Sequence, residues 1–467
     1  MSVQSNRLPQ VLLISHDVVG QSMAGPGIRY YHLARVLAHH ADVTLAIPNE
    51  RSAAMAPESF TAGAFKIVTY TLGNWASLAQ YVVKQDVCLL PSVVAFDFPE
   101  LSQCKTCLVV DGYDPLLPEW LASSRYDKTA DQARYWPTQM HVLRQQYLLG
   151  DFYICASERQ RDWWLGLLEA NGRINPDTFN ADPSLRNLID VVPFGLAAST
   201  PQHTKPVMKG VWPGLNHDDK ILLWGGGLWP WLDPLTAIRA VSKIWLQRQD
   251  VKLVFPGTKH PNPQVHGMPT LTEAAQQLAD ELGLRDKAVF FGDWVPYSDW
   301  DNILLESDIA LSLHFDTLET RLAFRSRVFD YVRANLPTVA TEGDATSELL
   351  MHYGIGCCVR YEDADQVAQA ILTLLATPKA DLAAHFSSAR QALTWEEGAR
   401  PLIRFCQQPH RAADRRAAGP HPGHPDYVHL QEQIKTQKAL IKAYESGLFM
   451  RTMRWLRHLR PPQRTKA

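Results

Sequence analysis

The residues best suited to chemistry gather in one segment of the chain, residues 311–348. An apolar run typical of a strand is followed there by several polar residues, of which the candidates are His314, Glu319, Arg325, Arg327 and Asp330. Ligand sites of α/β proteins form where strands end. Carboxylates can accept hydrogen bonds from sugar hydroxyls, and guanidinium groups offer planar donors that suit phosphate oxygens. The segment therefore predicts a binding site, and the alternative is a surface ion-pair cluster on a helix.

Two glycine-containing loops also follow apolar runs. The first contains Gly25 and Gly27, and the second contains Gly226 and Gly227. Without side chains, backbone N–H groups and a helix N-terminus can approach an anionic or hydroxyl-rich ligand. Neither loop has the spacing of a dinucleotide fingerprint or of a P-loop. Tight turns that need positive φ are the other interpretation.

The apolar runs that must position these residues recur along the chain without strict alternation, as expected of strands covered on both faces by helices. A first series of strands is predicted at residues 11–14, 43–47, 87–90, 107–110, 152–156 and 191–193. A second series is predicted at residues 221–224, 252–255, 289–291, 309–313 and 338–340. Helical patterns separate the runs, so we expect an α/β protein with two Rossmann-like domains. The predicted boundaries are 1–203, 204–406, a Pro/Gly linker at 407–426 and a basic amphipathic helix at 427–467.

Composition excludes several classes of protein. A chain of 467 residues with 46% hydrophobic and 20% charged residues is an ordinary soluble balance. A net charge of −2 argues against a protein that coats nucleic acid. The start lacks a secretory signal pattern, and no apolar stretch is long enough to span a membrane, so the expected location is cytoplasmic. No grouping of acids or histidines predicts a metal site, and no cofactor is expected.

The C-terminal tail has the opposite charge balance from the body. Residues 433–467 contain nine Lys/Arg and one acid, Glu445. Apolar residues around Trp455 fall on one side of a helical wheel and arginines on the other, a pattern typical of helices on anionic membrane surfaces. The tail therefore predicts peripheral contact with the inner face of the cell membrane. Apolar residues spaced by seven from Tyr427 to Trp455 also allow a homodimer formed by a short coiled coil. Packing of the tail on the body is the third alternative.

An ordered set of short motifs resembles the family 4 (group 1) retaining glycosyltransferases. The motifs are residues 24–29 with 33–34, 110–115, 191–195, 224–227, 292–296, 325–344 and 354–356. The resemblance covers residues 11–405. It implies a GT-B fold, a nucleoside diphosphate sugar donor held mainly by the C-terminal domain, and an acceptor site in the N-terminal domain.

The sequence departs from that family in two places. The family's first carboxylate position falls on Leu322, so Glu319 would have to serve in a shifted register. The family also has an Arg and a Lys after the second glycine loop, where this chain has neither, and Asp233 there is expected to cap a helix. We therefore predict that Arg325 and Arg327 replace the missing cations.

The resulting prediction is retaining, metal-independent transfer of a sugar from a UDP- or GDP-type donor to a cell-envelope glycan or glycolipid. The predicted catalytic group is Glu319, Arg325, Arg327 and Asp330, and the predicted donor contacts are Gly226, Gly227, Trp294, His314 and Gly356. The acceptor and phosphate loop is assigned to Gly25, Gly27, Arg29 and Asp111, with His16, Asp17 and Asp114 as further acceptor candidates. A nucleotide-sugar 2-epimerase and a non-catalytic scaffold that binds glycan precursors are the alternatives.

Overall fold

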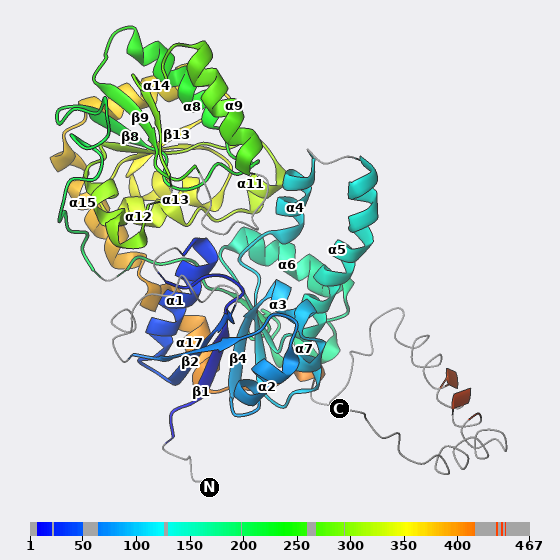
Figure 1. The fold of residues 1–467 in the computed structure, drawn as a ribbon. Coiled ribbons are helices and arrows are strands. Elements are labelled where there is room, and N and C mark those ends of the chain that lie inside the picture. The colour runs from blue at the N-terminus through cyan, green and yellow to red at the C-terminus, as the bar shows by residue number, and fades with distance from the viewer. Residues whose placement is uncertain are drawn as a thin grey trace, which may run out of the picture.

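The structure is a computed structural model that describes residues 7–20, 23–49, 64–125, 129–197, 199–258, 268–293 and 295–415, with a few positions between 436 and 444. Figure 1 shows two α/β domains, each built around one sheet. The predicted tail at 427–467 lies almost wholly outside the described residues. Among the described helices, none is both long enough and apolar enough to cross a membrane.

The first domain has a seven-stranded sheet in the order β3-β2-β1-β4-β5-β6-β7, and every pairing is parallel. Its strands are β1 (Gln10–Ile14), β2 (Asp42–Pro48), β3 (Lys66–Tyr70), β4 (Val87–Pro91), β5 (Cys107–Asp111), β6 (Phe152–Cys155) and β7 (Ile189–Val191). Its helices are α1 (Gly25–Leu37), α2 (Trp75–Val82), α3 (Ser92–Asp97), α4 (Leu116–Ser124), α5 (Thr129–Leu149), α6 (Glu158–Ala170) and α7 (Pro176–Ala181). Strand β3 is absent from the sequence prediction.

The second domain has a six-stranded parallel sheet in the order β10-β9-β8-β11-β12-β13. Its strands are β8 (Lys220–Leu223), β9 (Val251–Phe255), β10 (Val289–Phe291), β11 (Ile309–Ser312), β12 (Thr338–Thr341) and β13 (Gly356–Val359). Its helices are α8 (Pro234–Trp245), α9 (Met268–Glu281), α10 (Trp300–Leu305), α11 (Leu318–Leu322), α12 (Arg327–Arg333), α13 (Ala345–Tyr353), α14 (Ala364–Ala376) and α15 (Lys379–Ala392). The predicted class of two Rossmann-like domains is confirmed.

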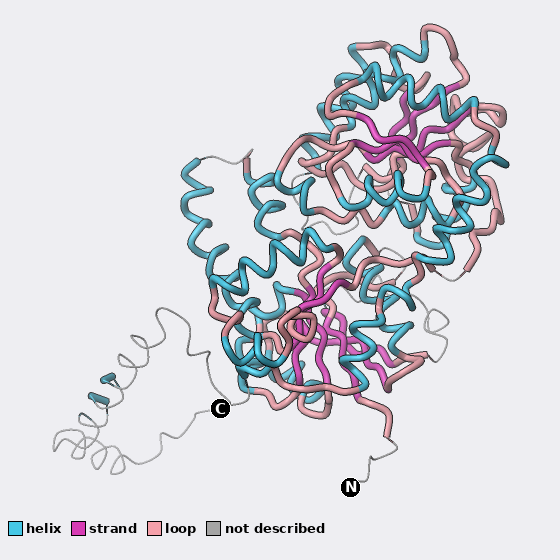
Figure 2. The backbone as a smooth tube through the Cα atoms, turned by 180° about the vertical axis from the view of Figure 1, so that it is seen from behind, coloured by secondary structure: helices cyan, strands magenta, loops and turns pink. Residues whose placement is uncertain are grey.

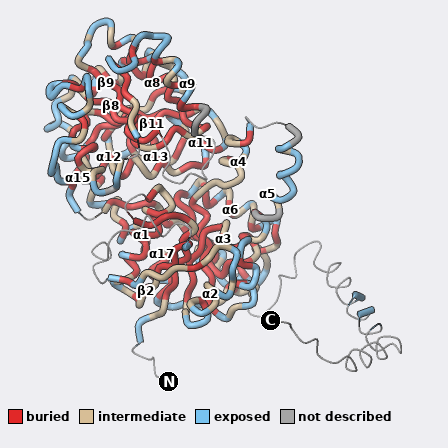
Figure 3. Tube along the Cα trace, viewed as in Figure 1, coloured by how far each residue is buried: buried red, intermediate tan, exposed pale blue. Residues whose placement is uncertain are grey.

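The central strands are buried on both faces, which explains their unbroken apolar sequences. All residues of β4 and β5 are buried, and Figure 3 shows buried residues in red through the centre of both domains. Figure 2 shows the same arrangement from behind, with helices around each sheet. Asp233 caps α8 through a 2.9 Å hydrogen bond from the Thr236 backbone N–H, so the predicted cap is confirmed.

After α15 the chain returns to the first domain. The Leu196 backbone N–H donates to the Leu393 carbonyl oxygen over 2.7 Å, so the two segments that cross between the domains lie side by side. Helices α16 (Trp395–Gly398) and α17 (Arg400–Gln407) follow, and Phe405 stacks on Phe152 with ring centroids 4.8 Å apart. The predicted second domain, 204–406, therefore needs a correction, because these two helices pack on the first sheet.

The first part of the predicted linker at 407–426 is also packed on the first domain. Asp414 forms a two-pronged ion pair with Arg173, at 2.7 and 3.0 Å, and both side chains are almost fully buried. Arg411 pairs with the buried Asp151 at 3.0 Å. A buried charge needs a partner that replaces its hydration. Residues 411–415 are therefore a docked segment, which corrects the prediction of a free linker there.

Candidate active site

A cavity of about 670 Å³ lies between the two domains, at the carboxyl ends of the strands. In the first domain its walls come from the loops after β1, β5 and β7 and from α1, α4 and α5. In the second domain they come from the loops after β8 and β9 and from the start of α12. Loops at this edge of parallel sheets are the usual place for ligands. The predicted location of the site between the domains agrees with this cavity.

The glycine loop after β8 forms one wall. The Gly225 N–H donates to the Tyr331 hydroxyl over 3.0 Å, and a Cβ at this glycine would lie only 2.5 Å from that oxygen. Gly226 has a φ of +103°, which residues with a side chain rarely adopt. The loop therefore requires glycine, and it brings bare backbone to the cavity. The predicted positions of Gly226 and Gly227 on the cavity agree with the structure.

Arg327 lies directly over this loop. A Cβ placed on Gly226 would be 3.7 Å from Cζ of Arg327, and Arg327 lines the cavity. Its Nη1 is buried and has no hydrogen-bond partner among the described residues. Burial lowers the pKa of Arg327 from the usual arginine value, because the charged form loses hydration. A half-buried guanidinium that faces a cavity and whose Nη1 lacks such a partner suits an anionic ligand.

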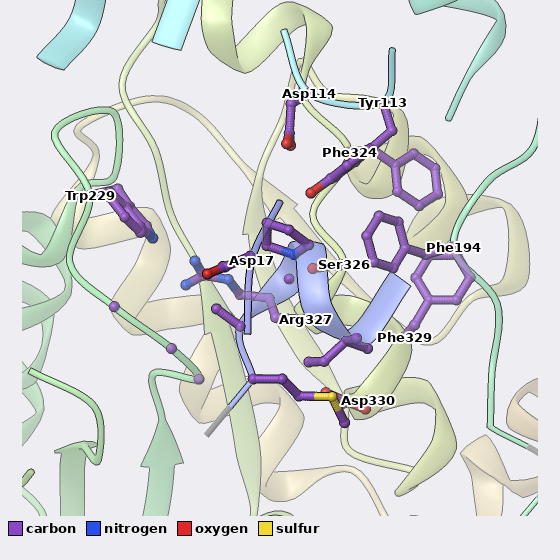
Figure 4. A pocket seen from close by; sticks show the side chains of 18 of the residues that line it. Asp17, Tyr113, Asp114, Phe194, Trp229, Phe324, Ser326, Arg327, Phe329 and Asp330 are labelled. Atoms are coloured by element: carbon purple, nitrogen blue, oxygen red, sulfur yellow. The ribbon is translucent and has the colours of Figure 1, made fainter. Parts of the chain in front are cut away.

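Asp330 lies on the same cavity, one helical turn after Arg327. Its Oδ2 accepts a 3.0 Å hydrogen bond from Trp300 Nε1, and burial raises the pKa of this carboxyl. Figure 4 shows Arg327 near the middle of the view, with Asp114 and Asp330 toward opposite ends. Across the cavity, a Cβ on Gly25 would lie 3.8 Å from Ser326 Oγ, so the first glycine loop faces the start of α12.

The other two predicted catalytic residues, Glu319 and Arg325, are bound to each other. Two hydrogen bonds of 2.8 Å join their side chains, both nearly inaccessible, and neither residue lines the cavity. Their assignment as substrate-contacting groups is corrected: they form a buried ion pair that braces the segment between α11 and α12. A single buried charge without a partner would be strongly destabilising, which explains why the two residues are buried together as an ion pair.

The predicted donor contact His314 belongs to the same buried network. Its Nε2 lies 3.1 Å from Asp344 Oδ2, which in turn lies 3.4 Å from Nε of Arg325. Burial, and then the charge of Arg325, lower the pKa of His314. This histidine is completely buried away from the cavity, so its assignment to the donor is also corrected.

Arg29 and Asp111 are likewise a structural pair. Arg29 Nε and Nη2 donate to the two carboxylate oxygens over 2.7 and 2.9 Å, and both side chains are fully buried. The guanidinium also lies over the rings of Tyr113 and Phe194. The prediction that these residues contact the acceptor is wrong, because their hydrogen-bonding groups face each other.

Three more predicted residues have other outcomes. A Cβ on Gly27 would lie 2.0 Å from the Val18 carbonyl oxygen, and one on Gly356 would lie 2.2 Å from that of Thr338. Both glycines are needed for close backbone packing and do not line the cavity, so their assignment to ligand loops is corrected. Trp294 lies outside the described residues.

Two carboxylates on the first-domain side complete the site. Asp114, an acceptor candidate from its position after β5, and Glu119, which the sequence analysis missed, both line the cavity. Burial, together with the charges of Asp111 and Glu319, raises the pKa of Asp114 to about 7. Burial and the neighbouring carboxylates also raise the pKa of Glu119 well above its usual value. His16 and Asp17 lie on the same wall. Within the described part of the chain, no group of three or more metal-ligating side chains gathers at one point.

Comparison with known proteins identifies the class. Residues 219–377 match the family described as Glycosyl transferases group 1. No curated protein sequence matches the chain. A sucrose-phosphate synthase from Thermosynechococcus elongatus has 16% identity and a TM-score of 0.58, over 86% of this chain and 98% of that one. Anabaena Alr3699/HepE, solved with UDP and glucose, has 14% identity and a TM-score of 0.57, over 86% and 100%.

A third similar structure is WaaG, a glycosyltransferase of lipopolysaccharide biosynthesis, with 13% identity and a TM-score of 0.55 over 88% of this chain and all of the other. These likenesses show the GT-B fold. The second domain belongs to the group 1 glycosyltransferases, and the resemblance drawn from the sequence is confirmed. The family match of the second domain and the shared fold both support a glycosyltransferase.

Proposed function

We propose that this enzyme transfers a sugar, with retention and without a metal ion, from a UDP- or GDP-type donor to a glycan or glycolipid of the cell envelope. The observation that carries the proposal is the guanidinium of Arg327 over the glycine loop of the second domain. A leaving diphosphate needs charge stabilisation, and preorganised donors usually supply the largest part of it.

Each side of the cavity has a distinct part in the proposed reaction. Arg327 and the backbone N–H groups of Gly226 and Gly227 would hold the diphosphate, and Asp330 would accept from donor hydroxyls. The acceptor hydroxyl would approach the anomeric carbon from the face that the diphosphate leaves. The new C–O bond forms as the old one breaks, and the acceptor proton passes to the departing phosphate oxygen. No protein nucleophile is required.

The donor prediction is tested by nucleotide-sugar screening. UDP- or GDP-sugars should raise the melting temperature, because a ligand that binds only the folded state stabilises it; at 100 times Kd the gain is about 2.7 kcal/mol. The effective donor should then support release of its nucleotide with a sugar acceptor, at an unchanged rate in EDTA. Absence of stabilisation by every nucleotide sugar would contradict the proposed donor class, and loss of turnover in EDTA would contradict metal independence.

The basic tail supports the membrane part of the proposal. Residues 433–467 contain nine Lys/Arg and one acid, and each basic residue near an anionic surface contributes about 1 kcal/mol. Truncation after Asp426 keeps the docked segment that ends with the Arg173–Asp414 pair, so the truncated enzyme should stay folded and use a soluble acceptor analogue.

The same truncation should abolish sedimentation with vesicles that contain phosphatidylserine. Vesicles of phosphatidylcholine alone serve as the control, since they carry no net negative charge. Failure of the full-length protein to sediment with anionic vesicles at low salt would contradict the proposed membrane contact. A change from dimer to monomer on truncation would instead favour a homodimer that forms through contact between two tails.

A further inference from the structure

Helix α5 projects beyond the body of the first domain, beside α4 and the edge of the second domain (Figure 1). Residues 133–138 are exposed on every side of the helix, and Figure 3 shows this stretch in pale blue. It nevertheless carries two large aromatic residues, Tyr135 and Trp136, which are 51% and 40% exposed. Hydrophobic burial therefore does not account for these two rings.

Trp136 lies on the face of α5 that leads into the cavity. Side chains three and seven residues apart share one face of a helix, which places Trp136 in line with Gln139 and Leu143. Both of those residues line the cavity. Tyr135 is one residue earlier, about 100° around the helix, and Arg134 Cζ lies 5.6 Å from its ring centre.

An aromatic contact joins this face to α4. The rings of Trp120 and Trp136 have centroids 5.6 Å apart at 33°, and Trp120 lines the cavity. The cavity wall thus continues outward, through Trp120, to the exposed ring of Trp136. The two indole rings therefore offer flat apolar faces at the place where a ligand too long for the cavity would extend out of it.

The charges of the first-domain wall narrow the class of that ligand. Among the described residues, Asp17, Asp114 and Glu119 line this wall, and no lysine or arginine of the first domain does. Arg29 is unavailable because Asp111 holds it in a buried pair. Carboxyl groups exchange hydrogen bonds with hydroxyls, and a wall that offers no cation cannot balance the charge of a phosphate or carboxylate group. The wall therefore suits an uncharged, hydroxyl-rich ligand.

We propose that Trp120 and Trp136 form an outer subsite that binds a second or third sugar unit of a neutral oligosaccharide acceptor, whose end lies in the cavity. The proposal rests on the proposed function and specifies its acceptor. The C–H faces of a pyranose ring pack on an aromatic ring, while its hydroxyls remain in water or reach the carboxylates. The enzyme would thus favour chains over single sugars.

The test measures binding of neutral oligosaccharides by calorimetry in the full-length enzyme. The probes are maltohexaose, cellohexaose and chitohexaose, each with its monosaccharide, and glucose 6-phosphate serves as the anionic probe. At least one hexasaccharide should bind more tightly than its monosaccharide, and glucose 6-phosphate should not bind this wall. Trp136→Ala should weaken binding of the hexasaccharide by about tenfold, which corresponds to ~1.4 kcal/mol. Binding of the monosaccharide should be unchanged.

Tyr135→Ala is the matched control, because it removes another exposed aromatic ring from a neighbouring face of the helix. It should bind the hexasaccharide like the wild type. The proposal is overturned if no hexasaccharide binds, or if both variants reduce the affinity for the hexasaccharide equally. It is also overturned if Trp136→Ala loses binding to anionic vesicles and keeps its binding to oligosaccharides. Nucleotide release from the donor with a monosaccharide acceptor should be equal in all three proteins. Its absence from the wild type would contradict the proposed function, not the outer subsite.

Discussion

Replacing Arg327 with alanine is expected to lower kcat/KM for the sugar donor by about 30-fold or more, equivalent to about 2 kcal/mol of lost stabilisation. Arg327 is the arginine that lies over the glycine loop, and its Nη1 has no hydrogen-bond partner among the described residues. Removing it leaves the developing charge of the diphosphate without its charged donor. Steady-state kinetics with the donor varied would measure the loss.

The stability of the Arg327 variant should change little, because no ion pair within the described part of the chain is broken. Arg321→Ala is the matched control, since that arginine is exposed on α11 and should leave the kinetics unchanged. Arg325→Ala should behave differently from both by destabilising the fold, because Glu319 would remain buried without its partner. Wild-type donor kinetics in Arg327→Ala would contradict the diphosphate role.

The second large effect is expected at Asp111. Substitution by alanine leaves Arg29 fully buried without its carboxylate, and breaking such a pair costs about 3–5 kcal/mol. Urea denaturation should show this loss as a lower free energy of unfolding. Acceptor affinity should fall only as far as the folded fraction falls, because Asp111 does not line the cavity.

An exposed ion pair provides the control for this measurement. Glu158 contacts Arg186 at 2.8 Å with both side chains substantially exposed, so Glu158→Ala should cost no more than about 1 kcal/mol. The double variant Arg29→Met with Asp111→Leu should recover part of the stability lost in Asp111→Ala, since neither buried charge remains. A stable Asp111→Ala enzyme with a selective loss of acceptor binding would restore the role predicted from the sequence.

The fold could be predicted from the sequence because the parallel strands are continuous apolar runs between helical patterns. The strands that were missed have mixed composition: β3 reads KIVTY, and β13 reads GCCV at the edge of the second sheet. An edge strand is covered less completely, so its sequence need not be uniformly apolar. The return of the chain to the first domain after α15 was missed because only packing contacts reveal it.

The site was predicted in part. The sequence placed Arg325 and Arg327 close together. It could not show that Glu319 forms an ion pair with Arg325 and not with Arg327, because that pairing depends on Asp344 and on the turn between α11 and α12. It likewise could not show that Arg29 finds Asp111, 82 positions away. Glu119 and Trp120 gave no signal, since they lie within a helix and reach the cavity only through its orientation.

The two chain segments that cross between the domains have a mechanical consequence. They are tied to each other by the hydrogen bond from Leu196 to Leu393, so they act as two adjacent tethers. A single tether would let one domain twist freely, whereas a tied pair resists torsion and permits bending across its own line. Arg159 reaches over from α6 to Glu348, and Gln160 donates to the Leu322 carbonyl oxygen, at a distance from that line. Any widening of the cavity between the domains would therefore have to break these two contacts, while the paired crossing segments would limit twisting.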